Sequence, residues 1–180
     1  MKKFLLPLIL AATITVNTES CDPEAMEIAA EGLEEMAAVL ANGNTYEYPN
    51  CTLVIRDKAN LISDSEESSI VTALDKYCNQ VECDILLMTT DEAGLSSISP
   101  GASYAQMYLP ADSENWICLT YDQKRESYHI YYDGEIAKKA CGGTQTDAIL
   151  NAGASHFRHE EYGKGLQAMA EVCLKRLTQK

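Results

Sequence analysis

The sequence predicts an α/β domain in which helices pack on a sheet. Two observations favour this fold class. The apolar fraction is 46%, which is enough for a buried core. The expected elements follow the order strand, helix, strand, helix, hairpin and further helices, an order that brings short strands together under a helical cover. With 180 residues, the chain has room for one such domain.

Four short runs have the composition of strands. Residues 52–55 are β-branched and apolar, and residues 83–90 form an apolar run of strand length. Residues 116–121 and 128–132 are strand-like runs on either side of a polar turn, so we expect them to form a hairpin, although the turn lacks a glycine.

The remaining segments have helical spacing. Ser63 and Glu66 have the spacing of a capping box, so a helix is expected to begin there. A Ser/Gly-rich loop over 91–101 precedes a short helix, capped near Ser103 and ended before Pro110. Apolar residues then recur at helical spacing in two further segments, near 148–152 and over 166–177.

The N-terminus has the pattern of a secretory signal. Lys2 and Lys3 precede an uncharged, mostly apolar stretch over 4–16, which is too short to span a bilayer. We therefore expect a signal segment over 1–20 and an extracytoplasmic protein that is secreted, periplasmic or on the cell surface. An amphipathic helix and a connector would occupy 21–50, and the α/β domain 51–180.

The chain contains seven cysteines, an odd number. Cys21 follows the expected cleavage site and is a candidate for lipidation, although Glu19 fits a lipoprotein signal poorly. The other six are an even set, which suggests disulfides in an exported chain. We expect a bridge between Cys78 and Cys83; the alternative is that some of the six are free, buried thiols.

The charge balance is acidic, with 14 lysines and arginines against 27 aspartates and glutamates. An acidic surface repels phosphate backbones and anionic lipid, so nucleic acid is not expected as a partner. Contact with a membrane is expected only through the signal segment or a lipid anchor. The surface would suit divalent cations or a basic partner, or could serve solubility alone.

Several motifs, taken in order, resemble the TPM domain from Thr52 to Leu177. A strand runs into Asp57 and is followed by Leu61-Ile62-Ser63 and early acids of a helix. The later motifs are Asp84–Thr89, Ser103-Tyr104-Ala105, Ile117–Tyr121 with Arg125, Gly134, and Tyr162–Leu166. The resemblance implies an extracytoplasmic three-layer sandwich with a small central sheet of about four strands flanked by helices. It also implies that one calcium ion is often bound.

One segment departs from the family pattern. Members usually have acidic residues and a glycine before the third strand, whereas Trp116 takes that glycine's place here. A loop that relied on a positive φ angle at this position would have to be rebuilt. The pattern leaves open whether Trp116 disrupts the metal loop.

Carboxylates near the strand ends are the best candidates for a site. Asp57 follows the first strand, and Asp112, Glu114 and Asn115 precede the third. Ligands collect at the carboxyl ends of strands in open α/β sheets, and hard oxygen ligands from two loops could hold Ca²⁺. The alternative for Asp57 is that it caps the turn before Leu61.

The leading hypothesis is a non-catalytic interaction or accessory module that binds calcium and serves a protein partner in an envelope or membrane complex. The alternative is a metal-assisted acid phosphatase of the TPM type, which would use Asp57 and would use Arg125 as a phosphate clamp. No nucleophile motif or phosphate-binding glycine loop supports catalysis. A third hypothesis is a structural lipoprotein anchored through Cys21.

Overall fold

The computed structural model describes residues 44–91 and 100–179, all within one compact unit. The signal segment expected at 1–20, Cys21, the helix expected after it and most of the loop at 91–101 lie outside the described residues. Within the described ranges, no helix has the length and hydropathy needed to cross a membrane.

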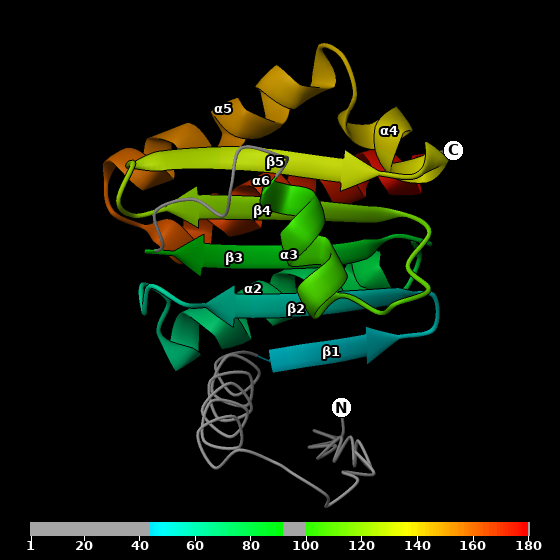
Figure 1. Cartoon of the computed structure of the whole chain (residues 1–180), viewed down its shortest axis with the longest axis horizontal. Coiled ribbons are helices and arrows are strands. Elements are labelled where there is room, and N and C mark those ends of the chain that lie inside the picture. The colour runs from blue at the N-terminus through cyan, green and yellow to red at the C-terminus, as the bar shows by residue number, and fades with distance from the viewer. Residues whose placement is uncertain (1–43, 92–99, 180) are drawn as a thin grey trace, which may run out of the picture. The chain divides into compact units, whose positions relative to one another are not determined.

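The described strands form one five-stranded sheet whose spatial order is the order of the chain, β1-β2-β3-β4-β5 (Figure 1). The strands are β1 (Asn44–Tyr48), β2 (Cys51–Asp57), β3 (Asp84–Thr90), β4 (Trp116–Asp122) and β5 (Ser127–Asp133). β2, β3 and β4 run parallel, and β1 and β5 lie antiparallel at the two edges.

The sheet has five strands, one more than the sequence indicated. The additional strand is β1, in the segment expected to be a connector, and it pairs with β2 in the register Thr45 to Val54. Its tyrosines Tyr46 and Tyr48 pack against the core, and the Tyr46 hydroxyl donates a hydrogen bond of 2.7 Å to Glu67. Packing of these two tyrosines therefore stabilises β1 as a strand, although the segment is polar.

Helices cover both faces of the sheet and make it the middle of three layers (Figure 1). One face carries α2 (Asp64–Cys78), α4 (Glu135–Cys141), α5 (Gln145–Arg158) and α6 (Tyr162–Thr178). The other face, called the α3 face below, carries α3 (Pro100–Tyr108), which contacts β4 and β5. The predicted α/β sandwich is confirmed.

The start of α2 is the capping box that the sequence predicted. The Glu66 backbone N–H donates to the Ser63 hydroxyl at 3.4 Å, and the Ser63 N–H donates to the Glu66 carboxylate at 3.0 Å. Two N–H groups that the helix leaves unpaired are thereby satisfied.

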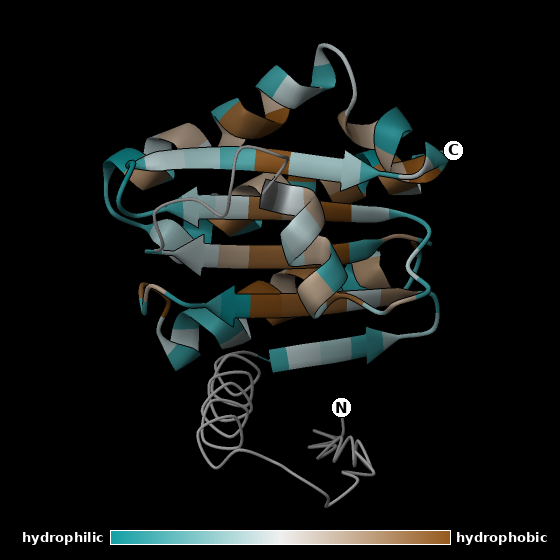
Figure 2. Cartoon of the chain, in the orientation of Figure 1, coloured by the Kyte–Doolittle hydropathy of each residue, from teal (hydrophilic) through white to brown (hydrophobic). Residues whose placement is uncertain are grey.

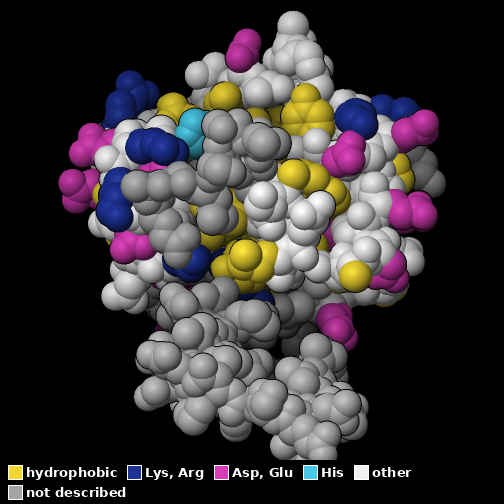
Figure 3. Space-filling model, in the orientation of Figure 1, with side chains coloured by type: hydrophobic (Ala, Val, Ile, Leu, Met, Phe, Trp, Pro, Cys, Tyr) yellow, Lys and Arg dark blue, Asp and Glu magenta, His cyan; other side chains and the backbone are white. Residues whose placement is uncertain are grey.

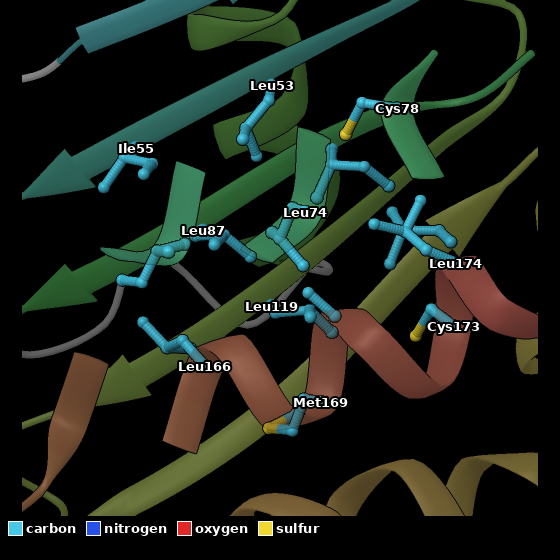
Figure 4. Packing of buried hydrophobic residues seen from close by; sticks show 14 of the residues in the cluster. Leu53, Ile55, Leu74, Cys78, Leu87, Leu119, Leu166, Met169, Cys173 and Leu174 are labelled. Atoms are coloured by element: carbon cyan, nitrogen blue, oxygen red, sulfur yellow. The ribbon is translucent and has the colours of Figure 1, made fainter. Parts of the chain in front are cut away.

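The main core lies between the sheet and the layer of α2 and α6 (Figure 4). Side chains alternate along each strand, so Leu53, Leu87 and Leu119 point into this core and are fully buried. They pack against Leu74 of α2 and Met169 of α6. The strand centres are correspondingly the most hydrophobic part of the sheet (Figure 2). Each buried leucine contributes about 2 kcal/mol to folding.

Two helices differ from the sequence expectations. α3 begins at Pro100, so Ser103 lies inside the helix and does not cap it. α4 has no counterpart among the expected helices.

The predicted hairpin of β4 and β5 is confirmed. In its turn, Glu126 has a φ of 48° and takes the left-handed position that a glycine commonly fills.

Candidate functional site

The three parallel strands finish at one end of the sheet, called the carboxyl end below. Asp57 of β2 lies level with Thr89 of β3 and Tyr121 of β4, and Thr90 lies level with Asp122. The carboxyl end of parallel strands is where open α/β sheets bind ligands, because the loops there leave a crevice.

Asp57 lies at this end and holds the loop that follows β2. One carboxylate oxygen accepts a hydrogen bond from the Leu61 N–H at 2.9 Å, and the other accepts from the Ile62 N–H at 2.8 Å. The Thr89 hydroxyl donates a further bond to the first oxygen. A carboxylate has about four lone-pair sites, so these three bonds leave about one for a metal or substrate. This geometry agrees with the alternative interpretation of Asp57, in which its side chain caps the turn before Leu61.

The 112–115 loop lies at the opposite end of the sheet. Trp116 is level with Asp84, the first residue of β3. Asp57, the last residue of β2, is instead level with Thr89, near the end of β3. The expectation that Asp57 and the group Asp112, Glu114 and Asn115 share one edge is therefore wrong. It failed because Asp57 ends a strand and the loop precedes one, and parallel strands keep their starts and ends apart.

The polar groups of the 112–115 loop serve local structure to different degrees. The Asn115 side-chain oxygen accepts from the Ile136 N–H at 3.0 Å and so caps α4. Ser113 donates to the Asp84 carboxylate, which also accepts from the Thr52 N–H at 2.6 Å. Asp112 and Glu114 are exposed. Trp116 is the first residue of β4 and is not among the residues with positive φ, so this loop needs no glycine at that position.

The α3 face carries a buried polar cluster near the carboxyl end, which we call the Arg56 cluster. Its members are Arg56, Thr90, Thr120 and Asp122, with 3–6% of each residue exposed. Arg56 and Thr120 lie on one cross-strand row, and Thr90 and Asp122 lie two residues further along the strands, so all four point to the same face. Sequence reasoning missed this cluster. Its one signal was a charged residue inside the apolar run Leu53-Val54-Ile55-Arg56.

Arg56 is the most unusual member of the cluster. Its guanidinium carbon lies 5.3 Å from the centroid of the Tyr108 ring, a cation–π distance. Among the described residues, Nε and Nη1 of Arg56 and the hydroxyl of Tyr108 are buried without a hydrogen-bond partner. Burial lowers the pKa of Arg56, because the charged form loses its hydration.

Arg125, the predicted phosphate clamp, lies in the β4–β5 turn at the same end. Its backbone N–H donates to Asp122 at 3.1 Å, and its guanidinium lies 3.4 Å from the other Asp122 oxygen. The Arg125 side chain is 57% exposed and that of Asp122 is 8% exposed. Arg125 therefore pairs with Asp122, the last residue of β4.

Basic side chains gather at the carboxyl end although the chain as a whole is acidic. Arg56 and Lys58 adjoin the end of β2, and Lys124 and Arg125 follow β4. Figure 3 shows lysine and arginine side chains at the left of the molecule, where the arrowheads of β2, β3 and β4 lie in Figure 1. Asp57, Asp91, Asp122 and Glu126 lie at the same end, so basic and acidic side chains are mixed there (Figure 3).

The structure does not contain the predicted Cys78–Cys83 bridge. All six cysteines from Cys51 to Cys173 are buried free thiols, and the Cys78 thiol raises the pKa of the neighbouring Cys51 thiol. Across the described part of the chain, no three histidine, cysteine or acidic side chains are arranged to hold a metal ion. Calcium ligation by Asp57 or by the 112–115 loop stays a prediction.

A model of the TPM domain family matches residues 55–176. This match covers the sheet from the middle of β2 and all helices from α2 to α6. A comparison with curated proteins found no match.

Three solved structures have similar folds. The BA42 protein of the psychrophilic bacterium Bizionia argentinensis has a TM-score of 0.54 at 16% identity, over 66% of this chain and 82% of that one. The N-terminal domain of the cg2496 protein from Corynebacterium glutamicum has a TM-score of 0.52 at 18% identity, over 67% and 77%. The N-terminal domain of a P. gingivalis protein has a TM-score of 0.55 at 15% identity, over 68% and 80%. At these identities the likeness shows the fold alone.

Proposed function

Because the chain belongs to the TPM domain family, we propose that it is a non-catalytic binding module that recognises an anionic group. The site is the Arg56 cluster at the carboxyl end of β2, β3 and β4. The observation that carries the proposal is the buried guanidinium of Arg56, with Nε and Nη1 unpaired among the described residues.

A buried, unpaired donor destabilises the free protein and favours a ligand that supplies an acceptor. Leaving a buried polar group unsatisfied costs about 1–3 kcal/mol, and more for a charged group. A carboxylate or phosphate oxygen would accept from Arg56, and the Tyr108 hydroxyl offers one more unpaired donor nearby. Lys58 and Lys124 add positive charge around the same end.

The carboxylates at this end support a binding role over a catalytic one. Asp57 accepts three hydrogen bonds that hold the β2 loop, and Asp122 accepts bonds from Arg125. A general base needs a free lone pair directed at the substrate. Three of the roughly four lone-pair sites of Asp57 are instead occupied by groups of the protein itself, and Asp122 is paired with Arg125.

Calcium belongs to this proposal as a second, separate site in the 112–115 loop. Asp112 and Glu114 are exposed, so their oxygens are accessible to a cation, whereas Asn115 is occupied by its bond to Ile136. Calcium titration followed by calorimetry should give binding that is lost in Asp112→Asn/Glu114→Gln. Binding that is lost only in Asp57→Asn would move the ion to the carboxyl end.

The partner we propose is a protein of an envelope or membrane complex, met outside the cytoplasm. The expected signal segment at 1–20 and the membership of the TPM family support this location. An acidic group of the partner that reaches Arg56 would fix the orientation of the two proteins, because charge complementarity contributes to specificity.

Anion binding can be tested with phosphate, and with succinate as a probe that carries carboxylates. Each anion at ten times its Kd should raise the melting temperature by about 5 °C. Arg56→Gln should abolish the shift. The control Arg125→Gln, an exposed arginine at the same end, should keep most of it. No shift with either anion, or an unchanged shift in Arg56→Gln, would contradict the proposal.

A metal-assisted phosphatase is the second candidate, because two arginines, Arg56 and Arg125, lie at the end that also carries Asp57. Phosphomonoester hydrolysis should be measured with calcium, with magnesium and with a chelator. Cation-dependent turnover that Asp57→Asn removes would replace the binding module by an enzyme. Binding of phosphate without turnover would keep the binding module.

A further inference from the structure

Five of the six described cysteines occupy one region of the core. They come from the start of β2, the end of α2, the residue before β3, the end of α4 and the middle of α6: Cys51, Cys78, Cys83, Cys141 and Cys173. Each is at most 2% exposed. The sixth, Cys118, lies apart on β4 and points to the α3 face. Figure 4 shows Cys78 and Cys173 entering the main core from α2 and α6.

Within this region the thiols form two neighbouring pairs. The sulfur atoms of Cys141 and Cys173 lie 3.8 Å apart, and Cys78 is the neighbour that most raises the pKa of the Cys51 thiol. Cys83 lies near both pairs but has its one hydrogen bond with a backbone carbonyl, that of Asp84. Sulfur atoms in contact need only a small rotation of the side chains to reach the 2.05 Å of a disulfide bond.

We propose that Cys51–Cys78 and Cys141–Cys173 are joined as two disulfides when the chain folds in an oxidising compartment, and that Cys83 and Cys118 stay thiols. The pairing replaces the Cys78–Cys83 bridge that the sequence suggested. Both partners in each pair are already in place in the folded core, so the bridges preserve the fold.

The oxidant is a disulfide, small or protein-borne, and each bridge forms by two exchanges. A cysteine thiolate attacks the disulfide of the oxidant, forms a mixed disulfide and releases one thiolate. The second cysteine thiolate then attacks the mixed disulfide, forms the bridge and releases the other. Two protein thiols are oxidised, the disulfide is reduced to two thiols, and the two protons pass to the released thiolates or to solvent.

Because the thiols are buried in the folded protein, the disulfides have to form before folding is complete. Burial and neighbouring thiols raise the pKa of Cys51, Cys83 and Cys173, so their thiols stay protonated in the folded core. The thiolate is the reactive form, and none of the five thiols is accessible to an oxidant after folding. The bridges therefore form before or during closure of the core, and a protein folded under reducing conditions resists later oxidation.

The two bridges connect elements that are distant in the sequence. Cys51–Cys78 joins the first residue of β2 to the last residue of α2, and Cys141–Cys173 joins α4 to α6 around the whole of α5. Cross-links over such intervals stabilise a fold mainly by restricting the unfolded chain.

The test is disulfide mapping of the full chain after refolding with oxidised glutathione. After alkylation in denaturant and proteolysis, mass spectrometry should identify linked peptides that contain Cys51 with Cys78 and Cys141 with Cys173. The intact mass should be about 4 Da below that of the reduced chain, the mass of four hydrogens. Six alkylated thiols from Cys51 to Cys173, or links through Cys83, would overturn the proposal.

Stability measurements provide a second, independent readout. Reduction should lower the melting temperature by about 10 °C. The control Cys118→Ala, which empties a buried site away from the pairs, should keep both linked peptides and the full reduction effect. Cys173→Ala should lose one linked peptide and part of that effect. If Cys173→Ala does not fold, mapping of the wild-type chain still decides the pairing.

Discussion

Asp57 and Thr89 face each other across the ends of β2 and β3, and the Thr89 hydroxyl donates a hydrogen bond to the Asp57 carboxylate. The same hydroxyl accepts from the Ala59 N–H at 3.2 Å, and the Thr89 carbonyl accepts from the Lys58 N–H at 3.1 Å. The pair thus fixes the loop from β2 into α2 from two sides.

Asp57→Asn should lower the free energy of unfolding by about 2 kcal/mol. The amide nitrogen would face a backbone N–H that now donates to a carboxylate oxygen, so two donors would meet. Urea denaturation measures this loss. Asp64→Asn, which changes an exposed acid in the first turn of α2, is the matched control and should cost less than half as much. Equal losses would mean that Asp57 contributes only charge near the helix start.

Gly134→Ala should be among the most destabilising glycine substitutions in the domain. Gly134 has φ +89°, and an added Cβ would lie 2.3 Å from both the Asn115 side-chain oxygen and the Glu114 carbonyl. We expect a loss of about 3 kcal/mol in the free energy of unfolding. The control is Gly143→Ala, which has φ +62° but open space around its Cβ position, and should cost about 1 kcal/mol. Similar losses at both positions would show that backbone strain, not the contact with Asn115, sets the cost.

Arg56→Met should leave the free protein as stable as the wild type or more stable by about 1 kcal/mol. The substitution removes a buried charge with unpaired donors and keeps a long apolar side chain beside Tyr108. The same variant should not respond to phosphate or succinate. Thermal unfolding with and without each anion measures both effects, and a loss above about 2 kcal/mol would show that Arg56 is structural.

The ion pairs of Glu161 should make stability depend on pH in the acid range. Hydrogen bonds from Lys164 and His156 lower the pKa of Glu161 from 4.5 to about 2. A pKa that is lower in the folded state gives a stabilisation that is present above pH 4.5 and is lost as the pH falls to about 2.

Glu161→Gln should therefore melt below the wild type at pH 7 and match it near pH 2. The difference at pH 7 should be small, because the Glu161 side chain is partly exposed and solvent screens its ion pairs. Glu160→Gln, a change at the neighbouring exposed acid, is the control and should show no such pH dependence. A difference that persists at low pH would contradict the proposed origin.

The sequence by itself determined the class of fold, the order of most elements and the family. Short β-branched, apolar or aromatic runs predicted β2 to β5, and the Ser63–Glu66 spacing predicted the start of α2, because these patterns depend on neighbours a few residues apart. β1 escaped prediction because its polar residues become a strand only through pairing with β2 and packing of Tyr46 and Tyr48.

Only the tertiary structure decided which side chains meet. The parallel direction of β2, β3 and β4 separated Asp57 from the 112–115 loop, and packing on the α3 face buried Arg56 beside Tyr108. Packing of the main core likewise placed Cys78 beside Cys51 as well as near Cys83. Local periodicity specifies the face of a residue, whereas strand direction and register, which arise from long-range packing, specify its neighbours.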